Sequence, residues 1–219
     1  MIKRADISAV IFDMDGLVLD TEKTYRAAWR EAGRAMLYDF PDVFLEGLAG
    51  LAGDAVLRRI VSFCGPGFDH GEFNRLTADC WREHVAVHGI EVKTGFHSLR
   101  DYLNREAIPF CLATNSALVN AEACLALAGL SGVFPVVVAR DHVRRPKPSP
   151  DIFLRAASAL KVEAGRCLVL EDSPAGIEAA FEAKALPVMV PSMFPVDAAT
   201  LARCRFVLND LAELPGKLG

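Results

Sequence analysis

The segment Ile7-Ser-Ala-Val-Ile-Phe-Asp13-Met-Asp15-Gly16 joins a short apolar run to two acids and a glycine. An apolar run of this length that ends at a turn is typical of a strand buried on both faces of a sheet. Gly16 permits a sharp turn after the acids, because glycine adopts backbone angles that other residues avoid. We therefore predict a buried strand whose carboxyl end presents Asp13 and Asp15.

Later segments repeat this short apolar pattern and are also predicted to be strands. They are residues 109–113, 134–139, 166–170 and 186–190, with residues 205–208 as an edge strand. Apolar stripes at helical spacing lie between several of them, in residues 96–103, 118–129 and 152–160. This alternation predicts an α/β fold with a Rossmann-like, doubly wound parallel sheet that is covered by helices on both faces.

The alternation is interrupted directly after the first strand. Helical patterns occupy residues 21–37, 54–63 and 73–88, with no convincing strand among them. We predict two domains, an α/β core of residues 1–16 and 93–219 and an inserted all-helical cap of residues 17–92. The cap is expected over the carboxyl ends of the strands, where open α/β sheets bind ligands. Its two connections, residues 16–20 and 91–95, are expected to act as hinges.

Composition narrows the class of protein. The 219 residues are 52% hydrophobic and 24% charged, which is an ordinary globular balance. A net charge of -4 offers no basic face to nucleic acid, and no stretch has the roughly 18 apolar residues of a membrane helix. The six cysteines lack metal-ligand spacing and indicate reduced thiols. We expect a cytoplasmic monomer or weak dimer that binds neither nucleic acid nor membrane.

Two pairs of acids follow predicted strands. Asp13 and Asp15 follow the first strand, and Glu171 and Asp172 follow the strand at residues 166–170. Four carboxylates that converge at one sheet edge repel each other unless a cation lies between them, and oxygen ligands suit Mg²⁺. One acid of the first pair can attack as a nucleophile while the other moves a proton. The sequence therefore predicts a magnesium site formed by these four acids.

Two further segments are suited to bind phosphate. Thr114-Asn115-Ser116 ends the second strand and opens a helix, where hydroxyl and backbone N–H groups form an anion site, although Ser116 can also simply cap that helix. Lys147 lies in a rigid, proline-rich loop and can neutralise phosphate charge. We predict that Thr114, Asn115, Ser116 and Lys147 bind the phosphoryl group.

The four segments together resemble the four motifs of the haloacid dehalogenase superfamily. They read Asp13-Met-Asp-Gly-Leu-Val-Leu-Asp20-Thr-Glu22, Ala113-Thr-Asn-Ser116, Lys147-Pro-Ser-Pro-Asp-Ile-Phe153 and Glu171-Asp-Ser-Pro-Ala-Gly-Ile-Glu-Ala-Ala180. The resemblance is greatest to the branch with a helical cap after the first motif, which includes β-phosphoglucomutase, phosphoglycolate phosphatase and pseudouridine-5′-phosphatase. It spans almost the whole chain, and four motifs in this order are highly specific.

The resemblance implies an Mg²⁺-dependent phosphatase that acts on a small phosphorylated metabolite, such as a sugar phosphate or a nucleotide-like monophosphate. It implies Asp13 as the nucleophile that forms an aspartyl-phosphate and Asp15 as the general acid and base, with Thr114 and Lys147 on the phosphoryl group. The side chains of Asp13 and Asp172 and the backbone carbonyl of Asp15 would hold Mg²⁺, and Glu171 would do so directly or through water.

The chain also departs from the family pattern at two places. The usual Gly-Lys-Pro before the third motif is replaced by Arg145-Pro146-Lys147-Pro148, and the usual Pro-Gly after the cap is Thr94-Gly95. The extra proline is expected to shift Lys147 slightly, and neither change removes a reacting group.

Two alternatives compete with hydrolysis. A sugar-phosphate mutase similar to β-phosphoglucomutase grips its substrate with a His and an Arg of the cap, where this chain has Tyr25 and Gly53. Water is therefore the favoured acceptor of the phosphoryl group. Arginines of the cap could replace the missing anchors if their helices turn them inward; these are Arg26, Arg30, Arg58 and Arg59. A signalling receiver domain would take the phosphate on an acid after the third strand, such as Asp141, but the helical insertion argues against it.

Overall fold

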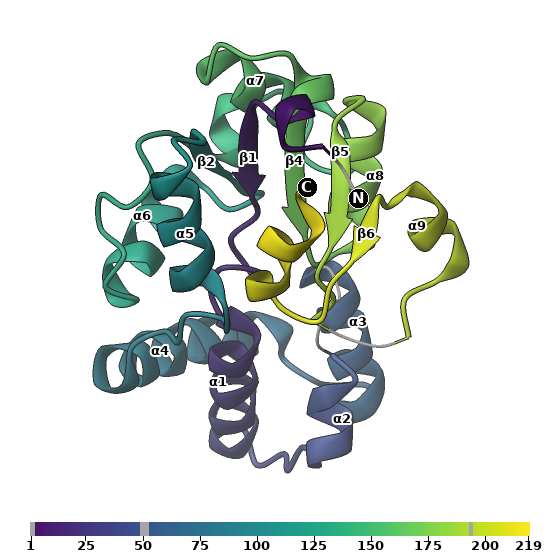
Figure 1. Cartoon of the computed structure of the whole chain (residues 1–219). Coiled ribbons are helices and arrows are strands. Elements are labelled where there is room, and N and C mark those ends of the chain that lie inside the picture. Colours follow the sequence, from purple (N-terminus) through teal and green to yellow (C-terminus); the bar gives the residue numbers. More distant parts are fainter. Residues whose placement is uncertain (1–2, 49–52, 193–194) are drawn as a thin grey trace. The chain divides into compact units, whose positions relative to one another are not determined.

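The computed structural model describes residues 3–48, 53–192 and 195–219 (Figure 1). The chain divides into two compact units. We call Met1–Leu19 with Val92–Gly219 the α/β unit, and Asp20–Glu91 the helical unit. The two connections between the units run side by side, because Lys93 N–H donates to Val18 O at 2.9 Å and Asp20 N–H donates to Glu91 O at 2.9 Å.

The α/β unit contains, among the described residues, a six-stranded parallel sheet in the order β3-β2-β1-β4-β5-β6 (Figure 1). Its strands are β1 Ala9–Phe12, β2 Phe110–Ala113, β3 Val137–Val138, β4 Cys167–Glu171, β5 Leu186–Met189 and β6 Phe206–Val207. The predicted doubly wound parallel sheet is confirmed. β3 and β6 are shorter than predicted, since each lies at a sheet edge and pairs with a single neighbour.

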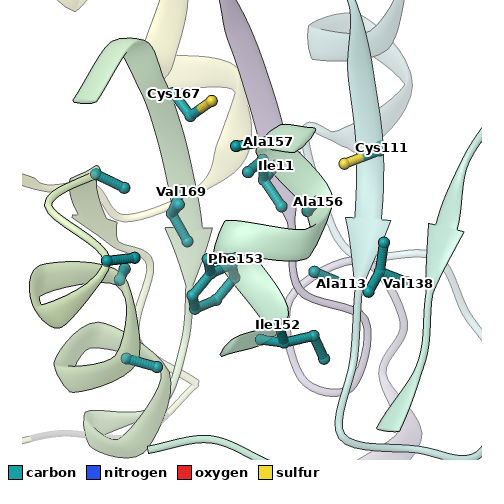
Figure 2. Packing of buried hydrophobic residues seen from close by; sticks show 14 of the residues in the cluster. Ile11, Cys111, Ala113, Val138, Ile152, Phe153, Ala156, Ala157, Cys167 and Val169 are labelled. Carbon is teal, nitrogen blue, oxygen red and sulfur yellow. The ribbon is translucent and has the colours of Figure 1, made fainter. Parts of the chain in front are cut away.

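Helices cover both faces of the sheet. They are α5 Phe96–Arg105, α6 Leu118–Leu127, α7 Asp151–Ala159, α8 Pro174–Glu182 and α9 Ala198–Arg203, with short 3-10 turns that include η2 Arg140–His142 and η4 Leu211–Lys217. On one face, Phe153 of α7 packs with Ile11 of β1 and Val169 of β4 (Figure 2). On the other face, the ring of Phe12 meets that of Phe96 at the start of α5, with centroids 5.7 Å apart.

This packing explains why the first strand is apolar at nearly every position. Alternate side chains of a strand point to opposite faces of the sheet. Ile11 therefore enters the core beside α7, while Phe12 enters the core beside α5, and both are fully buried. A strand that is buried on both faces has no room for polar alternation, so the sequence pattern identified it correctly.

The strand order reverses its direction between β1 and β4. The chain leaves β1 for β2 and β3 on one side and returns to β4 on the other side. In such sheets, ligands bind outside the carboxyl ends of the strands at the point where the order reverses. Phe12 of β1 is level with Leu170 of β4, so the next residues, Asp13 and Glu171, emerge together at this edge.

The helical unit contains α1 Thr21–Ala35, α2 Asp42–Glu46, α3 Gly53–Cys64 and α4 His70–His88. Its core is a separate apolar cluster that includes Phe40, Leu45, Ile60 and Phe73. α4 begins before the predicted residue 73, because the side chain of Asp69 accepts a hydrogen bond from Glu72 N–H and caps the helix. The short α2 was not predicted. None of the helices in residues 3–48, 53–192 and 195–219 combines the length and apolar character that a membrane crossing requires.

Candidate active site

The first acid pair is fixed by the turn that follows β1. Asp13 N–H donates to the carbonyl of Leu170 in β4 at 3.0 Å, which continues the sheet by one residue. Gly16 then turns the chain with a φ of +83°, and a Cβ at this position would collide with the carboxylate of Asp172. Glycine is therefore required at this position, both for the turn and for the close approach of the second acid pair.

Three acids come together at this edge of the sheet. One carboxylate oxygen from each of Asp13, Glu171 and Asp172 lies within 4.8 Å of the other two. Asp13 and Glu171 are buried, and Asp172 is half-buried. The carboxylate of Asp15 is not a member of this cluster. The contact of Asp15 with a metal through its backbone carbonyl stays a prediction.

Lys147 lies inside the acid cluster. Its Nζ donates to Glu171 Oε1 at 2.6 Å, to the carbonyl of Ala113 at 2.9 Å, and to Asp13 Oδ1. The side chain is 4% exposed, which places the ammonium group among the carboxylates and away from bulk water. The additional proline at position 146 therefore does not displace Lys147 from the site.

Burial and charge shift the pKa values of this buried group of side chains. The pKa of Asp13 is raised to about 8, chiefly by burial and also by the neighbouring Glu171 and Asp15, against the opposing effect of the Lys147 ammonium. For Lys147, burial favours the neutral amine, but the carboxylates of Asp13 and Glu171 outweigh it and raise its pKa. A single ammonium thus faces several carboxylates, and the surplus negative charge suits a bound cation.

Glu171 is held in place from two sides. Its Oε2 accepts hydrogen bonds from Ser173 Oγ at 2.9 Å and from Ser173 N–H at 3.3 Å, while Oε1 faces Lys147. Ser173 also accepts from Gly176 N–H at 3.1 Å and thereby caps the amino end of α8. A Cβ at Gly176 would collide with the Glu171 carboxylate, which therefore sits against the positive end of the helix.

The hydroxyl groups that follow β2 contact the second acid of the first motif. Ser116 Oγ donates to Asp15 Oδ2 at 2.9 Å, and Thr114 Oγ1 lies 3.4 Å from the same oxygen. The interpretation of Ser116 as a helix cap is wrong, because α6 begins at Leu118. Leu118 N–H donates instead to Asp141 Oδ1 at 3.0 Å.

Asn115 fastens the loop that carries Lys147. Its Oδ1 accepts from Lys147 N–H at 2.9 Å, and its Nδ2 donates to Lys147 O at 3.3 Å. The amide of the side chain thus pairs with both backbone polar groups of Lys147. This contact indicates a positioning role for Asn115, whereas the sequence predicted that it binds phosphate.

We expect the substitution Asn115→Ala to weaken catalysis through Lys147 without unfolding the enzyme. Two hydrogen bonds worth about 1 kcal/mol each would be lost, so kcat/KM should fall roughly tenfold or more. The measurement is steady-state hydrolysis of p-nitrophenyl phosphate together with thermal unfolding. Asn120→Ala, an exposed position on α6, is the matched control. Equal kinetics in both variants would contradict the positioning role.

The sequence reasoning missed Ser192. Its Oγ donates to Asp172 Oδ2 at 2.9 Å and orients that carboxylate toward the cluster. Ser192 follows β5, a strand that the apolar pattern predicted correctly. A hydroxyl just beyond the carboxyl end of a neighbouring parallel strand was therefore a usable signal.

The structure thus brings together most of the predicted site residues. Direct contacts connect the acid cluster to Lys147, Lys147 to Asn115, and the hydroxyls of Thr114 and Ser116 to Asp15. The family model of the haloacid dehalogenase-like hydrolases matches residues 7–184, and this span contains all of these residues. The chain belongs to this family. The predicted family is confirmed.

Several of the similar proteins are named as phosphatases. The chain is 34% identical to the fructose-1-phosphate phosphatase of Escherichia coli over 79% of this chain and 90% of that protein. It is 29% identical to hexitol phosphatase A of the same organism over 93% of this chain and 91% of that protein. A β-phosphoglucomutase structure from Clostridium difficile superposes with a TM-score of 0.70 at 27% identity, covering 95% of this chain and 93% of that one. These relationships identify the chain as a phosphatase of the family.

Proposed function

We propose that the enzyme hydrolyses a small phosphorylated metabolite, such as a sugar phosphate or a nucleotide-like monophosphate, through a phosphate ester on Asp13. The observation that carries this proposal is the contact of Asp13 with Lys147 inside a cluster of three acids. The relatives named for fructose 1-phosphate and hexitol phosphatase activity favour a phosphorylated sugar or sugar derivative.

The side chains suggest how the two halves of the reaction proceed. An Asp13 oxygen attacks phosphorus while the bond to the leaving oxygen breaks, and protonated Asp15 gives its proton to that oxygen. Lys147 offsets the negative charge of the phosphoryl group. Asp15, now a carboxylate held by Ser116, then takes a proton from the water that attacks phosphorus. The bond to Asp13 breaks, and inorganic phosphate is released.

The acid cluster fits a hard divalent cation. Three carboxylates within 4.8 Å of one another offer the oxygen ligands that Mg²⁺ prefers. We propose that Asp13, Asp172 and the backbone carbonyl of Asp15 hold Mg²⁺, with Glu171 bound directly or through water. When bound, the cation neutralises charge on the phosphoryl oxygens and orients them.

Hydrolysis is favoured over mutase chemistry by the partners of two arginines of the helical unit, Arg30 and Arg59. A mutase must hold both ends of a bisphosphate, which needs a second strong phosphate site in the helical unit. Arg30 forms an ion pair with Asp42, and Arg59 donates to the carbonyl of Gly47 at 2.6 Å. Tyr25 stacks on Trp81 with ring centroids 5.7 Å apart, and it supplies at most one neutral hydroxyl donor.

The test is the fate of the phosphoryl group. Free phosphate should appear from sugar monophosphates such as fructose 1-phosphate at a rate that no added sugar bisphosphate increases. The measurement is phosphate release followed beside product analysis, with and without bisphosphate. If bisphosphate instead drives β-glucose 1-phosphate to glucose 6-phosphate faster than phosphate is released, the mutase alternative is correct.

A further inference from the structure

One pocket of the α/β unit is lined by residues that are next in the sequence to groups of the phosphoryl site. Its volume is about 300 Å³, at the lower end of the range for small-molecule pockets, and it is lined by Ala117, Arg140, Asp141, Val143, Arg144 and Pro146. Ala117 directly follows Ser116, and Pro146 directly precedes Lys147. Two residues of the pocket lining are therefore adjacent in the sequence to Ser116 and Lys147, which we place around the phosphate.

Two arginine side chains supply the positive charge of this pocket. In the described ranges of the chain, the guanidinium groups of Arg140 and Arg144 have no hydrogen-bond or ion-pair partner. The neighbouring Arg145 differs, because it pairs with Asp151 at 2.8 Å and does not line the pocket. Asp141 is the one acid of the lining, and its Oδ1 already accepts from Leu118 N–H. The pocket thus carries a net positive charge, and the N–H donors of its two guanidinium groups can bind a ligand.

The turn that carries Arg140 is fixed. Arg140 N–H donates to the carbonyl of Ser116 at 3.0 Å, and the Asp141 carboxylate accepts from Leu118. Within the turn, His142 Nδ1 accepts from Ala139 N–H at 3.2 Å. η2 is therefore tied to the same segment that contributes the hydroxyls of the phosphoryl site. A group held here stays at a constant position relative to the phosphate, as specific binding requires.

We propose that this pocket binds a second anionic group of the substrate, a carboxylate or another phosphate, through Arg140 and Arg144. The inference rests on the proposed phosphatase function and sharpens it. Among small phosphorylated metabolites, those that carry another anion, such as phosphorylated hydroxy acids or sugar bisphosphates, would bind most tightly. Arginine suits this task, because its planar fork of N–H donors matches carboxylate and phosphate oxygens.

The experiment compares ligands that differ only in the second anion. One pair is 3-phosphoglycerate and glycerol 3-phosphate, and the other is fructose 1,6-bisphosphate and fructose 1-phosphate. Dissociation constants are measured by calorimetry with magnesium present, on enzyme that carries Asp13→Asn so that no ligand is consumed. The doubly substituted Arg140→Gln, Arg144→Gln enzyme should bind the member with two anionic groups about tenfold or more weakly in at least one pair. It should bind the partner ligand with unchanged affinity.

Arg155→Gln is the matched control, since it removes one exposed arginine of α7 that does not line the pocket. Equal weakening of both members of each pair would show unspecific attraction and overturn the proposal, as would no weakening at all. Turnover by the enzyme without substitutions is measured separately on the same ligands. Absence of turnover counts against the phosphatase function, while the difference in binding within each pair still decides on the pocket.

Discussion

The Asp13→Asn variant should release no phosphate from any substrate, although both units stay folded. A neutral amide is too weak a nucleophile to attack phosphorus, so the ester on residue 13 cannot form. The substitution preserves size and leaves Lys147 with its partner Glu171 at 2.6 Å. The measurements are phosphate release over long incubations and thermal unfolding of the variant beside the unsubstituted enzyme.

Asp15→Ala provides the matched comparison. This residue moves protons and does not attack, so its loss should slow turnover by roughly 10²–10⁴-fold and leave a measurable rate. Trapping of phosphoenzyme by rapid acid quench should detect the ester in Asp15→Ala and none in Asp13→Asn. Similar residual rates in the two variants, or phosphoenzyme in both, would refute the assignment of roles.

The sequence predicted the site because its acids are attached to the most regular part of the fold. β1 and β4 are short apolar runs buried on both faces, which is the pattern that single-sequence reasoning reads best. Parallel strands share one carboxyl edge, so residues after β1, β2 and β4 had to converge. Asp13, Thr114 and Glu171 follow from that rule with no knowledge of side-chain contacts.

The contacts that the sequence did not predict join segments that are far apart in the chain. Asn115 and Lys147 are 32 residues apart, and no local pattern indicates that an amide will pair with the backbone of a distant loop. Ser116 was read as a possible cap because Ser is common at helix starts. The tertiary contact with Asp15 and the cap supplied by Asp141 overrode that preference.

Removal of divalent cations should abolish activity, and Mg²⁺ should restore it. Without a cation the clustered acids repel each other and the incoming phosphate dianion, and the Lys147 ammonium offsets only part of their charge. Hydrolysis of p-nitrophenyl phosphate should stop after treatment with a chelator and resume on titration with magnesium chloride. Full activity in thoroughly metal-free buffer would eliminate this mechanism.

A second readout of the same cation does not depend on turnover. A ligand that binds only the folded state stabilises it by about 2.7 kcal/mol at 100 times its Kd, so Mg²⁺ should raise the temperature of unfolding. Asp172→Asn should remove most of this rise, because it deletes one of the three clustered carboxylates. Asp39→Asn changes an exposed aspartate outside the cluster and should keep the rise intact. An identical magnesium response in both variants would place the cation elsewhere.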